Sequence, residues 1–314
     1  MSTILVTRRL PSAVIATLEA AGSVQVYAGD GAMPRQELLD RLSKADGLVC
    51  MLTDRIDREV IDAAPRLKVV ANVAVGYNNI DVAYAASRGV VVTNTPDVLT
   101  ASVADLTWAM ILAVTRRLAE GDRLIRRSEW KGWAFDFMLG SELRGKQLGL
   151  VGMGRIARAV AARASPFGIL VAYASRRPQK VTNAKEMSFD QLLNTSDVVS
   201  LHVPLTDHTT HLIDRRALTR MKRSAYLVNT SRGPVVDEGD LAWALQQRLI
   251  AGAALDVYEK EPQVHSGLLA LDNVLLVPHL GSATSETRTA MAALAAENVA
   301  AVFSGRPALT PVTA

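Results

Sequence analysis

The feature that most constrains the fold is the glycine-rich stretch from Leu148 to Ala157, Leu-Gly-Leu-Val-Gly-Met-Gly-Arg-Ile-Ala. A short apolar run leads into Gly152 and Gly154, and an alanine-rich helical pattern continues to about Ala164. This order predicts a buried strand, a tight turn and a helix start. The free N–H groups of such a helix start bind a pyrophosphate, with Gly152 permitting the turn, Gly154 permitting close approach and Ala157 replacing a third glycine. Taken alone, the motif is weak evidence, because a pair of glycines after a strand often makes a tight turn without a ligand.

Length and composition indicate an ordinary globular protein of two domains. The chain has 314 residues, of which 49% are hydrophobic and 21% charged, and one core rarely grows to that length. No apolar run reaches the roughly 18 residues of a membrane span, and the start of the chain lacks a signal-peptide pattern. The single cysteine, Cys50, cannot form an internal disulfide, so we expect a cytoplasmic protein.

The charge pattern excludes some partners. A net charge of +4 is mildly basic and the arginines are spread along the chain. Such a pattern attracts small anions but is not a nucleic-acid signature. We therefore expect a small-molecule substrate, with no nucleic-acid, membrane or metal partner.

The first part of the chain alternates short strands with helical patterns. Such alternation predicts a parallel sheet with helices on both faces. We expect strands at residues 4–7, 24–27, 47–52, 68–74 and 90–93, and helices at residues 11–21, 34–44, 57–63 and 80–88.

The pattern changes after Thr95-Pro96. One long helical stretch follows from Thr100 to Arg127, with an interruption or kink expected near Gly121, and then comes the glycine motif. We expect the last helix, residues 286–303, to return to the first domain. The predicted domains are thus 1–97 with 285–314 (substrate domain) and 98–284 (dinucleotide-binding domain), the latter with further strands at 170–174, 198–202, 225–229, 252–256 and 274–277.

The residues after the second strand of the dinucleotide-binding domain bear on the cofactor. A carboxylate about 20 residues beyond the glycines binds the ribose 2′-OH of NAD, but this chain has Ser175, Arg176 and Arg177 there. Arginine binds a 2′-phosphate through forked donors, and each hydrogen bond to a charged group contributes about 1.5 to 3 kcal/mol. The pattern favours NADPH (NADP⁺), with NADH as the alternative cofactor. Two solvent-exposed arginines without a ligand would give the same sequence.

Three polar residues follow three later apolar strands, where open sheets bind ligands. His279 can protonate a carbonyl oxygen near neutral pH, and Glu261 can bind its other ring nitrogen. Arg232 can grip a substrate carboxylate with its forked donors. Each residue alone is more typical of a turn or of the surface. Together they favour a hydride-transfer site for 2-oxo acids.

The chain resembles the D-isomer-specific 2-hydroxyacid dehydrogenase family over nearly its whole length, most closely the glyoxylate/hydroxypyruvate reductase branch. The resemblance implies an α/β fold of two domains with parallel sheets, in which a Rossmann-type dinucleotide-binding domain is inserted in a flavodoxin-like substrate domain. The stretches that carry it are Val-Gly-Tyr-Asn-Asn-Ile-Asp at 75–81, the motifs at 152–156, 175–177, 229–233 and 255–259, and Pro-His-Leu-Gly-Ser-Ala-Thr at 278–284.

The resemblance also implies roles for individual residues. His279 is the implied proton donor, Glu261 its partner and Arg232 the substrate-binding arginine. Backbone N–H groups of Val75 and Gly76 would hold the substrate carboxylate, and the segment after residue 100 would join a homodimer. The implied cofactor-binding residues are Thr100, Gly152, Gly154, Arg155, Ile156, Ser175, Arg176, Arg177, Pro204, Thr230, Asp256, His279 and Gly281.

The function predicted from these features is NADPH-preferring reduction of small 2-oxo acids, glyoxylate and hydroxypyruvate first, to 2-hydroxy acids. A hydride reaches the 2-carbon while His279 protonates the oxygen, in a cleft expected to close between the domains. Two alternatives remain open. One is a reductase of a larger 2-keto acid, such as 2-ketogluconate or an aryl pyruvate, and the other is a non-catalytic dinucleotide-sensing protein of the same fold.

Overall fold

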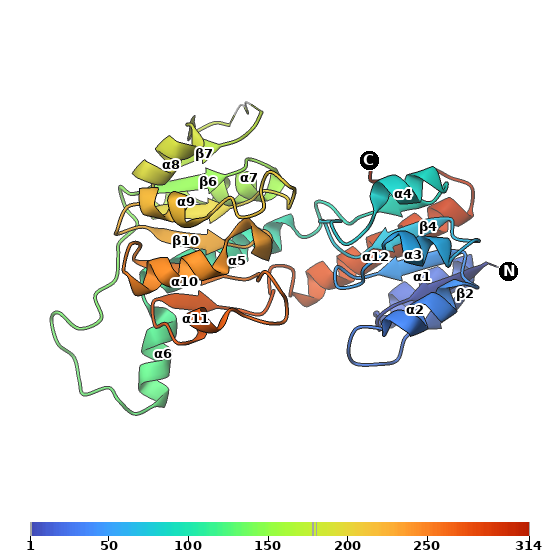
Figure 1. Ribbon diagram of the computed structural model, residues 1–314, viewed down its shortest axis with the longest axis horizontal. Helices are drawn as coiled ribbons and strands as arrows, with labels where there is room; N and C mark the ends of the chain where they lie inside the picture. The colour runs from blue at the N-terminus through green and yellow to red at the C-terminus, as the bar shows by residue number, and fades with distance from the viewer. Residues whose placement is uncertain (1, 178, 180, 314) are drawn as a thin grey trace. The chain divides into compact units, whose positions relative to one another are not determined.

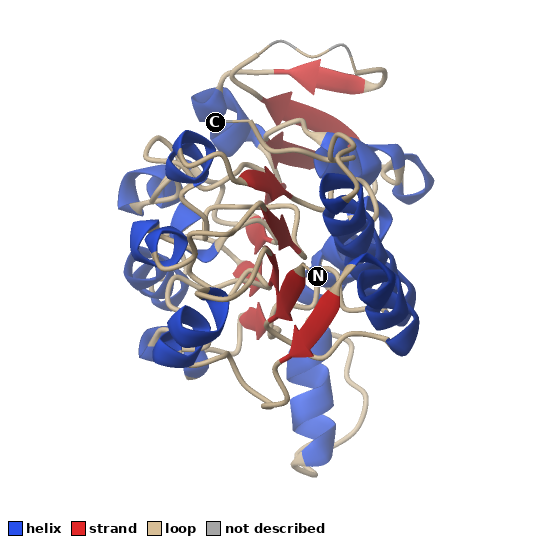
Figure 2. Cartoon of the chain, turned by 90° about the vertical axis from the view of Figure 1, so that its right-hand side faces the viewer, coloured by secondary structure: helices blue, strands red, loops and turns tan. Residues whose placement is uncertain are grey.

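Two parallel β-sheets organise the protein, whose computed structural model describes residues 2–177, 179 and 181–313. The chain divides into two units, which we call unit 1 (Met1–Leu99 with Ala283–Ala314) and unit 2 (Thr100–Ser282). Helices cover both faces of the sheets (Figures 1 and 2). No helix among the described residues has the length and apolar character that crossing a membrane requires.

The sheet of unit 1 has five parallel strands in the order β2-β1-β3-β4-β5, which is the flavodoxin-like order. Every residue of β3 and β4 is buried, as expected of strands covered on both faces. The strands are β1 (Thr3–Val6), β2 (Ser23–Val26), β3 (Gly47–Cys50), β4 (Val69–Asn72) and β5 (Val91–Thr93), and the helices between them are α1 (Ser12–Ala21), α2 (Arg35–Leu42), α3 (Arg58–Asp62) and α4 (Val82–Ser87).

The last helix, α12 (Ser285–Phe303), packs in unit 1 against α1, β3 and β4. Its alanine-rich face allows a close approach, and Ala295 and Val299 join Ile4 and Val6 in one apolar core. Thr284 caps the helix by accepting a hydrogen bond from the Thr287 N–H at 3.1 Å. Unit 1 is therefore built from both ends of the chain.

The sheet of unit 2 has seven parallel strands in the order β12-β11-β10-β9-β6-β7-β8. Counted within the unit, this is the Rossmann order 3-2-1-4-5-6 with one strand added, so the predicted fold class is confirmed. The strands are β6 (Gln147–Val151), β7 (Leu170–Ala174), β8 (Ala184–Glu186), β9 (Val198–Leu201), β10 (Tyr226–Asn229), β11 (Gly252–Leu255) and β12 (Val274–Leu276).

Two apolar cores lie on opposite faces of this sheet. One core joins α5 and α7 to the strands, and the other joins α8, α9, α10 and α11. The helices of unit 2 are α5 (Thr100–Thr115), α6 (Leu118–Arg126), α7 (Arg155–Ala162), α8 (Phe189–Thr195), α9 (Arg215–Arg220), α10 (Glu238–Gln246) and α11 (Ser266–Leu269), with short 3₁₀ turns at Ser165–Phe167 and Gly233–Val235.

The helical stretch predicted from Thr100 to Arg127, with an interruption or kink near Gly121, is two helices, and the interruption lies four residues before Gly121. The break lies at Arg117, which adopts a left-handed φ of 56°, whereas Gly121 lies inside α6. Arg117 makes two hydrogen bonds to Glu120, of 2.6 and 2.9 Å. These bonds favour a new helix start at Leu118 over continuation of α5.

Candidate active site

The glycine motif forms the predicted turn between β6 and α7. Gly152 has a φ of 91°, and a Cβ there would lie 2.5 Å from the carbonyl oxygen of His202, so only glycine fits. Gly154 has an ordinary φ of −75° as the N-cap of α7, and a Cβ there would meet nothing within 4 Å. The space at Gly154 and the N-terminus of α7 suit a pyrophosphate.

The basic segment predicted to select the cofactor follows β7. Because β7 pairs with β6 in parallel, with Ala174 opposite Val151, this segment and the glycine motif leave the sheet at the same edge. Arg176 and Arg177 are exposed, and the Ser175 hydroxyl donates to the Arg177 carbonyl at 2.6 Å. The segment therefore presents arginines where NAD-specific proteins place a carboxylate.

The three predicted catalytic residues follow three neighbouring strands, β10, β11 and β12. Both carboxylate oxygens of Glu261 lie within hydrogen-bond distance of His279 Nδ1, at 2.9 and 3.1 Å. The His279 and Glu261 side chains are 27% and 29% exposed, so the pair is shielded but reachable from solvent. Arg232 donates through Nη1 to the Ser231 carbonyl at 2.7 Å.

Electrostatics link the three side chains. Burial raises the pKa of the Glu261 carboxyl, but the hydrogen bond and charge of His279, with the Tyr258 N–H and Arg232, outweigh it and lower that pKa overall. Burial lowers the pKa of the Arg232 guanidinium, and the charge of Glu261 opposes this shift. Glu261 is therefore an anion near neutral pH, hydrogen-bonded to His279 and acted on by the charge of Arg232.

The backbone around His279 is held by Asp256. His279 has a left-handed φ of 53°, which is costly for a residue with a Cβ. Its N–H donates to the Asp256 carbonyl at 2.9 Å, and the Asp256 carboxylate accepts from the N–H groups of Leu280 and Gly281 at 2.5 and 2.9 Å. Asp256 is 1% exposed, and burial raises its pKa despite these bonds. In the structure, Asp256 fixes the turn that presents His279.

The loop that carries Glu261 runs against the segment that carries Arg232. A Cβ on Gly233 would stand 1.8 Å from the carbonyl carbon and oxygen of Tyr258, so these two backbones touch. The Tyr258 N–H donates to Glu261 at 3.1 Å, and its hydroxyl donates to the Val277 carbonyl at 2.9 Å. Tyr258 thereby ties the Glu261 loop to the strand that leads to His279.

Other predicted cofactor residues have structural partners as well. The hydroxyls of Thr230 and Thr107 lie 3.0 Å apart, and the Pro204 carbonyl accepts from Thr209 at 2.6 Å. Thr100 begins α5, and Arg155 and Ile156 begin α7. No sequence signal points to Ser102, whose hydroxyl donates to the Gly281 carbonyl at 2.9 Å and fixes that turn.

Val75 and Gly76 lie after β4 in unit 1. Their carbonyls accept from two asparagine side chains, Asn94 to Val75 at 2.7 Å and Asn72 to Gly76 at 2.9 Å. These bonds fix the loop backbone, and the assignment of its N–H groups to a substrate carboxylate stays a prediction. Asn72 went unnoticed in the sequence, although a polar residue closing an apolar strand is a usable signal.

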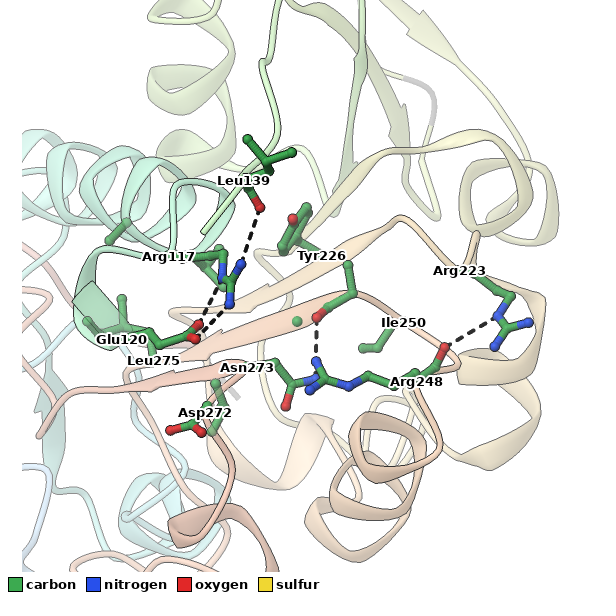
Figure 3. A pocket seen from close by; sticks show the side chains of 16 residues that line it. Arg117, Glu120, Leu139, Arg223, Tyr226, Arg248, Ile250, Asp272, Asn273 and Leu275 are labelled. Carbon is green, nitrogen blue, oxygen red and sulfur yellow. Dashed lines mark hydrogen bonds and ion pairs between the residues drawn. The ribbon is translucent and has the colours of Figure 1, made fainter. Parts of the chain in front are cut away.

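A cavity of about 400 Å³ lies at the opposite edge of the unit 2 sheet (Figure 3). It borders the first residues of β10, β11 and β12, and Arg117, Arg223 and Arg248 line it. None of the predicted site residues does so. Open α/β sheets bind ligands at the carboxyl ends of their strands, so we do not assign this cavity to the reaction. The described residues also contain no group of three side chains suited to a metal.

Comparison with known proteins gives one consistent family. The model of the D-isomer specific 2-hydroxyacid dehydrogenase NAD binding domain matches residues 108–281. Glyoxylate reductases of Thermococcus onnurineus and Thermofilum pendens are 47% and 48% identical, covering 96% and 98% of this chain and 93% of each relative. The NADPH-dependent glyoxylate/hydroxypyruvate reductase of Sinorhizobium meliloti, solved with NADP and malonate, is 36% identical with a TM-score of 0.88, covering 99% of this chain and 97% of that one.

The lowered pKa of Glu261 predicts a pH dependence of stability. A carboxylate whose pKa is lower in the folded state stabilises the fold above its unfolded pKa, and this contribution is lost as the pH falls through the folded pKa. We expect Glu261→Gln to melt below the wild type at about pH 6, and the two melting temperatures to converge as the pH falls below about 4.5. Calorimetry between about pH 6 and pH 3 measures the melting temperatures of the wild type and of the variant.

The matched control is Glu297→Gln, which removes an exposed carboxylate inside α12, away from the N-terminus of that helix. Its melting temperature is expected to follow that of the wild type throughout. A Glu261→Gln variant that stays equally far below the wild type down to pH 3 would contradict the assignment of a stabilising ion pair to Glu261.

Proposed function

The chain belongs to the D-isomer-specific 2-hydroxyacid dehydrogenase family, and from this premise we propose that it reduces glyoxylate and hydroxypyruvate with NADPH. Membership makes it an NAD(P)-dependent 2-hydroxyacid dehydrogenase that acts on a small 2-oxo acid. The observation that carries the proposed chemistry is the hydrogen-bonded pair of Glu261 and His279, with Arg232 close enough for its charge to act on Glu261.

The proposed mechanism assigns one task to each side chain. A bound nicotinamide supplies the hydride for the 2-carbon of the substrate. With Nδ1 bound to Glu261, His279 gives the proton on Nε2 to the carbonyl oxygen. Glu261 fixes the ring orientation and stabilises the imidazolium. Arg232 binds the substrate carboxylate and orients the carbonyl.

The choice of substrate rests on the relatives. The glyoxylate reductases share almost half of their residues with this chain, and the name of the Sinorhizobium meliloti enzyme adds hydroxypyruvate. Both are small 2-oxo acids of the predicted class. We also place the protein in the cytoplasm, because Cys50 is buried and forms no disulfide and disulfides are rare there.

Substitution of His279 tests the proton donor. General acid catalysis typically contributes about 10² to 10⁴-fold, so His279→Ala should lower kcat by that factor and leave the dissociation constant of NADPH nearly unchanged. The assay is NADPH oxidation with glyoxylate, hydroxypyruvate, pyruvate and 2-ketogluconate in parallel. His208→Ala, which removes an exposed histidine, should retain wild-type turnover.

Full turnover by His279→Ala would refute the assigned donor. A wild type fastest with 2-ketogluconate would favour the reductase of larger 2-keto acids. Tight NADPH binding without turnover of any of the four acids would favour a dinucleotide sensor.

The preference for NADPH rests on the segment after β7. Arg176 and Arg177 are exposed there, and a ribose 2′-phosphate matches the forked donors of arginine. The Sinorhizobium meliloti relative binds NADP. We therefore propose these two arginines as the residues that distinguish NADPH from NADH.

Two kinds of variant distinguish contacts to the ribose 2′-phosphate from contacts to the pyrophosphate. Replacing both Arg176 and Arg177 by alanine should raise the KM for NADPH by about 10- to 150-fold, with little change for NADH. Gly154→Ala should raise the KM for both cofactors, because its methyl group would occupy the space proposed for the pyrophosphate. Its melting temperature should fall only slightly, since the added Cβ meets nothing within 4 Å, although alanine is a poorer N-cap than glycine. Equal effects of the arginine changes on both cofactors would contradict the proposed selectivity.

We propose a homodimer through the arm, defined as residues 118–139. α6 buries none of its residues, and a soluble monomer rarely exposes so large an apolar patch. Half of the large apolar side chains that the described residues leave exposed belong to the arm: Leu118, Ile125, Trp130, Trp133, Phe135, Phe137 and Leu139.

Sedimentation analysis tests the dimer. The wild type should sediment as a particle of twice the 33.7 kDa chain mass. Replacing Trp133 and Phe135, which are 81% and 85% exposed, by aspartate should give monomers, because burial of charge at an interface is costly. Leu309→Asp, at a site 53% exposed in unit 1, is the control and should remain dimeric. A monomeric wild type would refute the proposal.

A further inference from the structure

The Glu238 carboxylate at the start of α10 lies in an unusual position. It is 5% exposed and accepts two backbone hydrogen bonds from residues beyond β11. One comes from the Glu259 N–H at 2.6 Å and the other from the His265 N–H at 3.0 Å. Each oxygen of the carboxylate therefore holds one side of the loop that contains Glu261.

Glu238 and Glu259 bind each other in both directions. The Glu259 carboxylate accepts from the Glu238 N–H at 2.8 Å, so two glutamates exchange backbone hydrogen bonds. We call Glu238, Glu259 and His265 the clasp. His211 faces the clasp, with Nε2 3.4 Å from Glu259 Oε1, and Asp237 caps α10 by accepting from the Asp240 N–H at 2.9 Å. The clasp thus joins the Glu261 loop to a capped helix start.

The segment from Arg232 to Glu238 touches the Glu261 loop at both of its ends. At one end Gly233 packs directly on the Tyr258 backbone, and at the other Glu238 binds Glu259 and His265. One stretch of chain consequently carries Arg232 and fixes the loop that carries Glu261. The spacing between these two side chains depends on both contacts.

We propose that Glu238 is a positioning residue for the Glu261–His279 pair, an inference that rests on the proposed function. Only a carboxylate can accept at both oxygens, because the amide of glutamine places a donor opposite one of the two N–H groups. Without the second bond the loop is free to shift, and a displacement of about 1 Å can cost about 10²-fold in rate. The side chain acts through backbone geometry and does not touch the substrate.

The test compares Glu238→Gln with Asp197→Asn. Asp197 also holds backbone, accepting from the Gln147 N–H at 2.9 Å, and it pairs with Lys222 at 3.0 Å. It lies at the amino ends of β6 and β9, away from His279. Both changes replace a carboxylate by an amide and are expected to lower the melting temperature. Only Glu238→Gln is expected to lower kcat, by about 10- to 100-fold, with the NADPH dissociation constant unchanged.

Proton NMR gives a readout independent of turnover. The proton between His279 Nδ1 and Glu261 should give a downfield resonance that is absent in His279→Ala. We expect this resonance to move or disappear in Glu238→Gln and to persist in Asp197→Asn. A Glu238→Gln variant with wild-type kcat and an unchanged resonance would overturn the proposal.

Failure of the proposed function and failure of the positioning role of Glu238 give different results. A wild type without turnover whose resonance still responds to Glu238→Gln refutes the proposed function and supports the positioning role. If Glu238→Gln does not fold, Glu238→Asp replaces it, because its shorter carboxylate cannot reach both N–H groups. The same loss of kcat and resonance is then expected, and wild-type values would overturn the inference.

Discussion

Parallel pairing of β10, β11 and β12 is the constraint on which the candidate site depends. In the register of this sheet Asn229 lies opposite Leu255, and Leu255 opposite Leu276. Because the strands run in the same direction, the segments after them leave the sheet at one edge. Arg232, Glu261 and His279 all come shortly after these strands in sequence. Their approach to one another therefore results from strand register before any side chain forms a bond.

Buried carboxylates then convert this approximate convergence into a defined geometry. Asp256 binds the turn after His279 and Glu238 binds the loop around Glu261, each by accepting two backbone N–H groups. Such bonds are charge-assisted and satisfy donors that would otherwise be buried without partners. Of the three carboxylates Glu261, Asp256 and Glu238, the first bonds to the histidine of the candidate site, and the other two hold backbone.

Local patterns in the sequence were enough to predict every strand except β8, the glycine turn and the residues at the strand ends. These features depend on short apolar runs and on the residues directly after each run. An interruption of the long helical stretch was predicted, but its position at Arg117 was not, because it depends on a pairing with Glu120 that a helical pattern hides. β8 was missed since two of its three residues are exposed, which removes the apolar signal. The clasp joins residues more than 20 positions apart, and no local pattern marks such a contact.

The choice of arginine at position 232 is explained by its surroundings. Burial lowers the pKa of any cationic side chain at this position. The pKa of a lysine starts closer to neutral pH than that of an arginine and shifts readily on burial, so a lysine would lose its charge more easily. A guanidinium has a much higher pKa than an ammonium, so it stays charged even though burial lowers its pKa. It can therefore raise the local potential at Glu261 and still offer a fork to a second carboxylate. A cation that must act on Glu261 from a buried position is thus better supplied by an arginine, for reasons of protonation as well as of geometry.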